Sequence, residues 1–217
     1  MDKFKNINKK VYIKKVLFST VGTILCMLGI SFLYVAKLGT DPITVFIDGI
    51  SMHVSLSIGT INTICNIVLV VLMLIFERKL FDLETLIQAL ISGFFLDLFI
   101  VLFEKPFSVF NGELYASLIM MFVGIAIYAF GIAITIACDV GIGPFNFPPL
   151  YFARILKAKL KYVQMVTDAL YFLVGTLLGG LIGIGTLLCS VLFGPFLSYF
   201  IDKLQPMVDG WGNTYKE

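Results

Sequence analysis

Six long apolar stretches limit what this chain can fold into. Each is long enough to cross about 30 Å of hydrocarbon as an α-helix, which rises about 1.5 Å per residue. Charged residues make up 14% of the 217-residue chain, whereas a soluble domain carries about 25%. We therefore predict an all-α membrane protein with six transmembrane helices. We place them at residues 15–37, 57–77, 84–103, 114–138, 162–181 and 184–203.

The basic residues predict how these helices are oriented. If the tail at residues 1–14 lies on one side, it and the alternate loops place 14 of the 16 Lys and Arg residues there, and only Lys37 and Lys105 face the other side. Because Lys- and Arg-rich loops stay in the cytoplasm, we expect the tails at residues 1–14 and 205–217 to be cytoplasmic. The first apolar run is too long for a typical signal-peptide core, so we expect it to be retained as a helix.

The chain matches itself at a shift of 102 residues in the first part of each half and 101 in the last part. A unit of three spans must begin its second copy on the opposite side of the membrane. We therefore predict two inverted three-helix repeats, at residues 15–104 and 114–204. The matched pairs at 102 are Gly22 and Gly124, Gly29 and Gly131, Gly39 and Gly141, Pro42 and Pro144, Asn62 and Gln164, and Asn66 and Asp168; those at 101 include Thr85 and Thr186, and Gly93 and Gly194.

Both repeats interrupt the chain after their first helix. The turns Gly39-x-x-Pro42 and Gly141-x-x-Pro144 end that helix, and the segments that follow are amphipathic and too short to cross the membrane. Each segment fits a short re-entrant helix or an interfacial one. Interrupted segments at matching places in two halves point to a binding site, so these four residues are candidates for substrate binding. Ordinary surface loops with helices lying on the lipid are the alternative.

Polar residues inside the predicted spans are the second sign of a site, because an ionisable residue in the membrane is costly. Asn62 and Asn66 are four residues apart on one helix face, and Gln164 and Asp168 are their counterparts. We predict that these four residues bind substrate at the repeat interface, with Asp168 as a proton or cation acceptor. Asp97, in the third span, is a second candidate for ion coupling. The alternative is that these side chains only hold helices together.

Other chemistries have no motif in this chain. The four cysteines stand singly in apolar runs, as small hydrophobic residues do, and His53 is the only histidine. No metal-ligand cluster, nucleophile–base pair or phosphate-binding loop is visible. We therefore expect neither an enzyme, nor a bound metal or cofactor, nor a nucleic-acid partner.

Four strings, LGTDPITVFIDGIS, SIGTIN, VGIGPFN and GGLIGIGT, carry a family resemblance. They resemble the YczE/YitT-like group of bacterial membrane proteins, whose members have a Gly-x-x-Pro turn, a Ser-Ile-Gly-Thr entry to the second helix and a Gly-Gly-x-x-Gly-x-Gly-Thr near the end. Here these are residues 39–42, 57–60 and 179–186. Ile43 stands where the group leads us to expect tryptophan, and Phe145-Asn146 where a more polar pair is common. The resemblance implies a bacterial inner-membrane protein and points toward vitamin or small-metabolite movement.

Three functions fit these expectations. The first is a secondary transporter of a small polar metabolite, vitamin-like or amino-acid-like, which rocks one repeat against the other. The second is a substrate-binding membrane subunit that a separate ATPase energises. The third is a non-transporting adaptor that docks a partner through its basic segment at residues 154–161. The expected partners are the lipid bilayer, a small-molecule substrate, and either a second copy of the chain or an ATPase.

Overall fold

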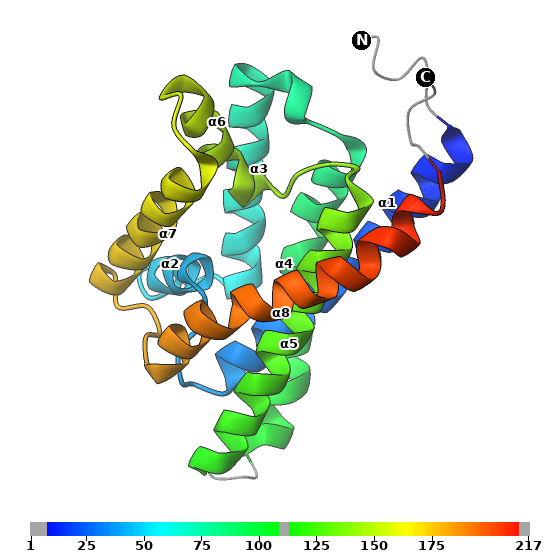
Figure 1. Cartoon of the computed structure of the whole chain (residues 1–217). Helices are drawn as coiled ribbons and strands as arrows, with labels where there is room; N and C mark the ends of the chain where they lie inside the picture. The colour runs from blue at the N-terminus through cyan, green and yellow to red at the C-terminus, as the bar shows by residue number, and fades with distance from the viewer. Residues whose placement is uncertain (1–7, 109–112, 213–217) are drawn as a thin grey trace.

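The computed structural model describes residues 8–108 and 113–212, and all regular structure within them is helical (Figure 1). Helices α1, α3, α4, α5, α7 and α8 coincide with the six predicted apolar stretches, and α2 and α6 are short. Two 3-10 turns, η2 at Arg78–Leu80 and η3 at Pro144–Asn146, complete the elements. The α-helices are α1 Lys9–Val35, α2 Pro42–Ser51, α3 Ile58–Phe76, α4 Leu83–Ser108, α5 Leu114–Cys138, α6 Phe147–Ile155, α7 Leu160–Leu177 and α8 Ile184–Asp209.

Five of these helices, α1, α3, α4, α5 and α8, are long and apolar enough to cross a membrane. The chain is therefore a multi-pass membrane protein. Large apolar side chains stay exposed along one face of α3, at Ile64, Val68, Val71 and Ile75, as expected where lipid is the solvent. The sixth predicted span forms α7, but Gln164 and other polar side chains keep its hydropathy below that of the five.

Helices α1 and α8 are longer than the apolar stretches that predicted them. Helix α1 begins at Lys9 and α8 continues to Asp209, so both enter the segments predicted as tails. Tyr12 and Val16 of α1 are buried in one cluster with Leu204 and Val208 of α8. Packing between the two helix ends, which hydropathy does not register, accounts for the extra turns.

The centre of the molecule is a close crossing of α1 and α5 (Figure 1). A Cβ atom placed on Gly22 would lie 2.9 Å from the carbonyl oxygen of Gly131, and one on Gly29 would lie 2.7 Å from that of Gly124. Small residues let helix backbones touch in this way. Helix α4 packs on α1, and α8 packs on α5.

The remaining helices pack unevenly. Helix α3 lies against α4, where Gly59 and Gly93 face each other too closely for a side chain on either. Helix α2 lies against the end of α7, where a Cβ on Gly49 would be 2.6 Å from the carbonyl oxygen of Gly175. By contrast, α7 and α8 diverge from the short loop that joins them (Figure 1).

Candidate functional site

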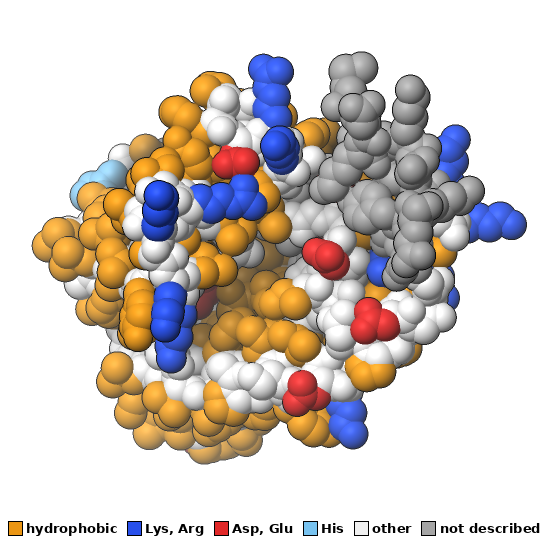
Figure 2. All heavy atoms as spheres, turned by 45° about the horizontal axis from the view of Figure 1, so that its top comes forward, with side chains coloured by type: hydrophobic (Ala, Val, Ile, Leu, Met, Phe, Trp, Pro, Cys, Tyr) orange, Lys and Arg blue, Asp and Glu red, His pale blue; other side chains and the backbone are white. Residues whose placement is uncertain are grey.

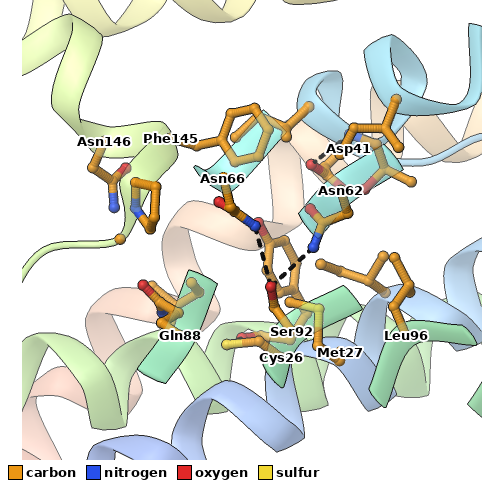
Figure 3. Close-up of a pocket in the computed structure, with 18 residues that line it drawn as sticks. Cys26, Met27, Asp41, Asn62, Asn66, Gln88, Ser92, Leu96, Phe145 and Asn146 are labelled. Carbon is orange, nitrogen blue, oxygen red and sulfur yellow. Dashed lines mark hydrogen bonds between the residues drawn. The ribbon is translucent and has the colours of Figure 1, made fainter. Parts of the chain in front are cut away.

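A cavity of about 120 Å³ lies where α1, α3, α4 and α5 meet the first turn of α2 and the η3 turn (Figure 3). Six separate segments therefore contribute side chains to one small space. The interrupted segments after the first and fourth predicted helices both reach it, α2 through Asp41 and Thr44, and η3 through Pro144 and Asn146.

One wall of the cavity is a polar cluster between α3 and α4. Asn62 and Asn66, one helical turn apart, both donate from Nδ2 to Ser92 Oγ, at 2.9 and 3.1 Å. All three side chains are buried. Figure 3 shows the two amides converging on Ser92 from the side of the cavity. The two bonds also join α3 to α4, each contributing about 0.6–2 kcal/mol.

Asp41 supplies an acidic group to the cavity. It is the N-cap of α2: its carboxylate accepts from the backbone N–H of Thr44 at 3.3 Å and from the Thr44 hydroxyl at 2.6 Å. The side chain is 6% exposed. A carboxylate has about four lone-pair sites, so the two bonds from Thr44 leave acceptor capacity on the cavity side.

Gln88, one helical turn from Ser92 on α4, and Asn146 of η3 also line the cavity. Gln88 donates from Nε2 to Thr23 Oγ1 at 3.3 Å, and its Oε1 is buried without a hydrogen-bond partner. Sequence reasoning missed Asp41, Gln88 and Ser92. The first lies inside a Gly-x-x-Pro turn that was noted only for its backbone, and the other two lie in a span with no polar counterpart to draw attention.

The floor of the cavity is the α1–α5 crossing. Cys26 of α1 and Tyr128 of α5 both line it, and Cys26 Sγ lies 4.0 Å from the carbonyl oxygen of Tyr128. Met27, Ile30 and Phe145 add apolar surface. The cavity thus offers polar groups on its walls and an apolar bed, the usual make-up of a small-molecule site.

The sequence and its relatives place the chain in a family. Residues 13–202 match the family described as "Family of unknown function (DUF6198)". The chain belongs to this family. The protein YyaS of Bacillus subtilis is 27% identical over 191 residues, which cover 88% of this chain and 94% of the relative. An uncharacterized protein of Haemophilus influenzae is 25% identical over 175 residues, covering 81% and 78%.

The resemblance to YczE-like proteins is confirmed. "Uncharacterized membrane protein YczE" of Bacillus subtilis is 22% identical over 187 residues, covering 86% of this chain and 85% of the relative. No solved structure matches the chain. The family therefore agrees with a multi-pass membrane protein and leaves the chemistry of the cavity to be argued from its residues.

The cavity of this DUF6198 protein holds three of the residues that the sequence predicts as substrate-binding, namely Asn62, Asn66 and Pro144. Gly39, Pro42 and Gly141 shape the turns beside it. Gly39 has a φ of +107°, which favours glycine, and a Cβ on it would lie 2.5 Å from Thr186 Oγ1. Pro42 stands in the first turn of α2, where its missing N–H costs nothing.

Gln164 and Asp168 lie outside the cavity lining. Gln164 donates to Asp168 at 2.9 Å along α7, and both are half-buried. Asp168 still lies within electrostatic range of Asp41. The structure therefore brings Asn62 and Asn66 into the cavity and leaves their two counterparts outside its lining.

Asp97 of α4 lies at the start of α3, about one helical turn along the α3–α4 contact from Asn62 and Ser92. Its carboxylate accepts from Ser57 Oγ and from the backbone N–H of Gly59 at 2.8 Å. Both donors belong to the first turn of α3, whose free N–H groups and dipole favour an anion. In this position Asp97 ties the start of α3 to α4, and its part in ion coupling stays a prediction.

A second buried acid, Glu84, lies near the start of α4 and was not singled out from sequence. It is 2% exposed and accepts from Ser19 Oγ of α1 at 2.8 Å. Within residues 8–108 and 113–212, no group of three or more His, Cys, Asp or Glu side chains is placed to hold a metal ion. The Ser19–Glu84 hydrogen bond joins α1 to α4.

Figure 2 shows a hollow on the face that includes the top of Figure 1. Hydrophobic side chains form its floor, and Lys and Arg side chains stand along part of its rim. Among the basic residues predicted to be cytoplasmic, Lys157, Lys159 and Lys161 are exposed, and Arg154 pairs with Glu77 at 2.9 Å.

Proposed function

We propose that the protein is a transporter of a small polar solute in the bacterial cytoplasmic membrane. It consists of two inverted repeats of three spans, with α7 as the sixth span, and binds its solute in the cavity between the repeats. Both termini are cytoplasmic. Solute binding between inverted repeats near the middle of the membrane is a recurrent arrangement in secondary transporters.

The observation that carries this proposal is the reciprocal contact of α1 with α5. The shift of 102 residues turns Gly22 into Gly124 and Gly29 into Gly131, so it exchanges the contact Gly22–Gly131 with the contact Gly124–Gly29. A two-fold relation between like units produces contacts that exchange in this way. The shift also turns Cys26 into Tyr128, which touch each other.

The position of the Cys26–Tyr128 contact supports the choice of cavity. Two residues that exchange with each other and touch lie on the pseudo-two-fold axis, and both line the cavity. The turns follow the same relation. A Cβ on Gly39 would meet Thr186 Oγ1, and one on Gly141 would lie 3.0 Å from Thr85 Oγ1. Binding on the axis is what alternating access between two repeats requires.

The uneven packing of the two halves supports movement. Gly93 is pressed against Gly59, whereas a Cβ on its counterpart Gly194 would have no atom within 4 Å. In a transporter built of inverted repeats, one side is closed while the other is open, and the two repeats exchange these arrangements. The hollow in Figure 2, which has Lys and Arg side chains along one part of its rim and Asp and Glu side chains along another, corresponds to the open, cytoplasmic side.

Uptake by the purified protein in liposomes tests this proposal. We expect solute-specific counterflow without ATP, from a panel of vitamins, amino acids, nucleosides and small amines. Asn62→Ala and Asn66→Ala are expected to lower the rate at least tenfold. Ser190→Ala is the matched control, because the Ser190 hydroxyl bonds only within α8, to the carbonyl oxygen of Thr186 at 2.9 Å.

Two other results would replace the proposal. Binding of a solute without transport, restored to transport by a copurified ATPase, would make the chain the substrate-binding subunit of a larger transporter. A well-folded protein that neither binds nor moves any solute, but retains a protein partner through its basic segment at residues 154–161, would make it an adaptor.

A further inference from the structure

The cavity has an unbalanced charge. Asp41 is the one carboxylate among the described residues that line it, and none of those residues is Lys, Arg or His. Asp168 of α7, which does not line the cavity, is a second acidic group within electrostatic range of Asp41. A buried carboxylate is costly unless a cation or several donors compensate it; here Thr44 and the backbone N–H groups at the start of α2 act on Asp41, and no cation lines the cavity.

The neutral polar groups of the cavity add acceptors. Asn62 and Asn66 each donate one N–H from Nδ2 to Ser92, and Gln88 donates one from Nε2 to Thr23, so each amide keeps a second N–H. The Oε1 of Gln88 is buried without a donor, and no hydrogen bond given by the described residues reaches Oδ1 of either asparagine. A ligand that brings hydrogen-bond donors can bind to these free amide oxygens.

Aromatic rings lie beside the acidic groups. Tyr128 and Phe145 line the cavity. The centre of the Phe145 ring lies 5.8 Å from that of the Tyr171 ring, and the Tyr171 ring centre lies 5.4 Å from that of Phe46. Tyr171 is one helical turn from Asp168 on α7. Aromatic faces attract organic cations, and they do so more strongly where water is excluded.

We propose that the solute is a small organic cation, an amine or substituted ammonium compound, with its charged nitrogen near Asp41. This inference rests on the proposed function, since it takes the cavity to be the solute site. The ammonium group supplies the missing positive charge and donates to the free amide oxygens. The Cys26–Tyr128 floor and Phe145 accept its carbon portion. Repulsion by Asp41 and Asp168 excludes anions.

Asp41 also has a purely structural role, as the N-cap of α2. Asparagine caps a helix about as well as aspartate, so Asp41→Asn keeps an oxygen for the Thr44 N–H and removes the charge; its NH2 replaces the oxygen that faces the Thr44 hydroxyl, which can then accept instead of donating. Asp139→Asn is the matched control. Asp139 is exposed, ends α5 with a φ of 47°, and lies outside the cavity, and asparagine tolerates that backbone conformation.

The test measures binding to the purified protein in lipid nanodiscs. The probes are ethylammonium, tetramethylammonium and choline, with 3,3-dimethylbutan-1-ol as the neutral match for choline and 3,3-dimethylbutanoate as the anion. We expect at least one amine to bind, the neutral and anionic probes not to bind, and the dissociation constant to rise at least tenfold in Asp41→Asn but not in Asp139→Asn.

The outcomes separate this inference from the proposed function. Equal amine binding by the wild type and Asp41→Asn overturns the inference. So does uptake of only neutral or anionic solutes, which leaves the transporter proposal standing. If the folded protein neither binds nor takes up a solute of any class, both proposals fail together.

Discussion

At the scale of single residues, the α1–α5 crossing depends on glycines that leave no room for a methyl group. A Cβ on Gly29 would lie 2.7 Å from the carbonyl oxygen of Gly124 and equally close to the Tyr128 Cα atom. We expect Gly29→Ala to force the helices apart and to lower the free energy of unfolding by about 1–3 kcal/mol. The measurement is the apparent melting temperature in detergent.

Gly194→Ala is the control for that substitution. Gly194 also lies inside a helix, but a Cβ on it would meet no atom within 4 Å. We expect this variant to be as stable as the wild type or slightly more stable, since alanine favours helix over glycine by about 1 kcal/mol. If both variants melt at the same temperature, the backbones at the crossing are not in contact.

Sequence alone predicted part of the site at this scale. The repeat drew attention to Asn62 and Asn66, and both line the cavity. It drew equal attention to Gln164 and Asp168, which do not line the cavity. A sequence repeat reports what the two halves share, whereas the structure has the halves in different arrangements. Ser92, whose counterpart is Phe193, carries no signal of this kind.

At the scale of helices, hydropathy predicted where helices lie better than how they pack. The stretch predicted at residues 57–77 forms α3 at Ile58–Phe76, and the one at 114–138 forms α5 with the same bounds. The packing of α2 against α7 was not predicted, because it depends on Gly49 meeting Gly175 across 126 positions of sequence. The spacing of apolar residues indicates which face of a helix is buried, but it does not indicate which other helix packs against that face.

In the structure α3 packs on α4, whereas α7 and α8 stand apart. If the two repeats exchange these arrangements, α7 should come into contact with α8. Ser57 Oγ now bonds to Asp97 at the start of α3, and the repeat turns this pair into Lys159 and Ser198. We expect Lys159→Cys with Ser198→Cys to form a disulfide when α7 closes on α8. The background has its four native cysteines replaced by alanine, and cross-linking is measured with and without a transported solute.

The pair Ser57→Cys with Asp97→Cys is the matched control. It lies in contact in the arrangement described here, so its disulfide should decrease under the conditions in which the Lys159–Ser198 pair cross-links. The two pairs should thus change in opposite directions. Cross-linking of both pairs in every condition, or of the Ser57–Asp97 pair alone in every condition, would contradict alternating access.

At the scale of the whole molecule, the two described ends of the chain bear on the number of spans. The start of α1 and the end of α8 lie side by side (Figure 1). The Lys14 ammonium lies 3.8 Å from the centre of the Trp211 ring, whose centre is 5.3 Å from that of Phe18. Helix ends in contact lie on one side of the membrane, which requires an even number of crossings.

Five apolar helices alone would give an odd number, so we predict that α7 supplies the sixth crossing. Its polar side chains do not forbid this, because Gln164 and Asp168 bond to each other and face protein in part. In-membrane polar groups that pair with one another are the usual exception to an apolar span.

Reporter fusions decide the count. Green fluorescent protein fluoresces only in the cytoplasm, and alkaline phosphatase is active only outside it. With six spans, we expect fluorescence from a fusion after residue 217 and phosphatase activity from one in the loop at residues 178–183. A fusion after Lys79 is the cytoplasmic control and one after Leu56 the external control. If α7 does not cross, both test fusions reverse: the 178–183 loop becomes cytoplasmic and the C-terminus external. That result would break the inverted repeat, because the second unit would then cross the membrane twice and the first unit three times.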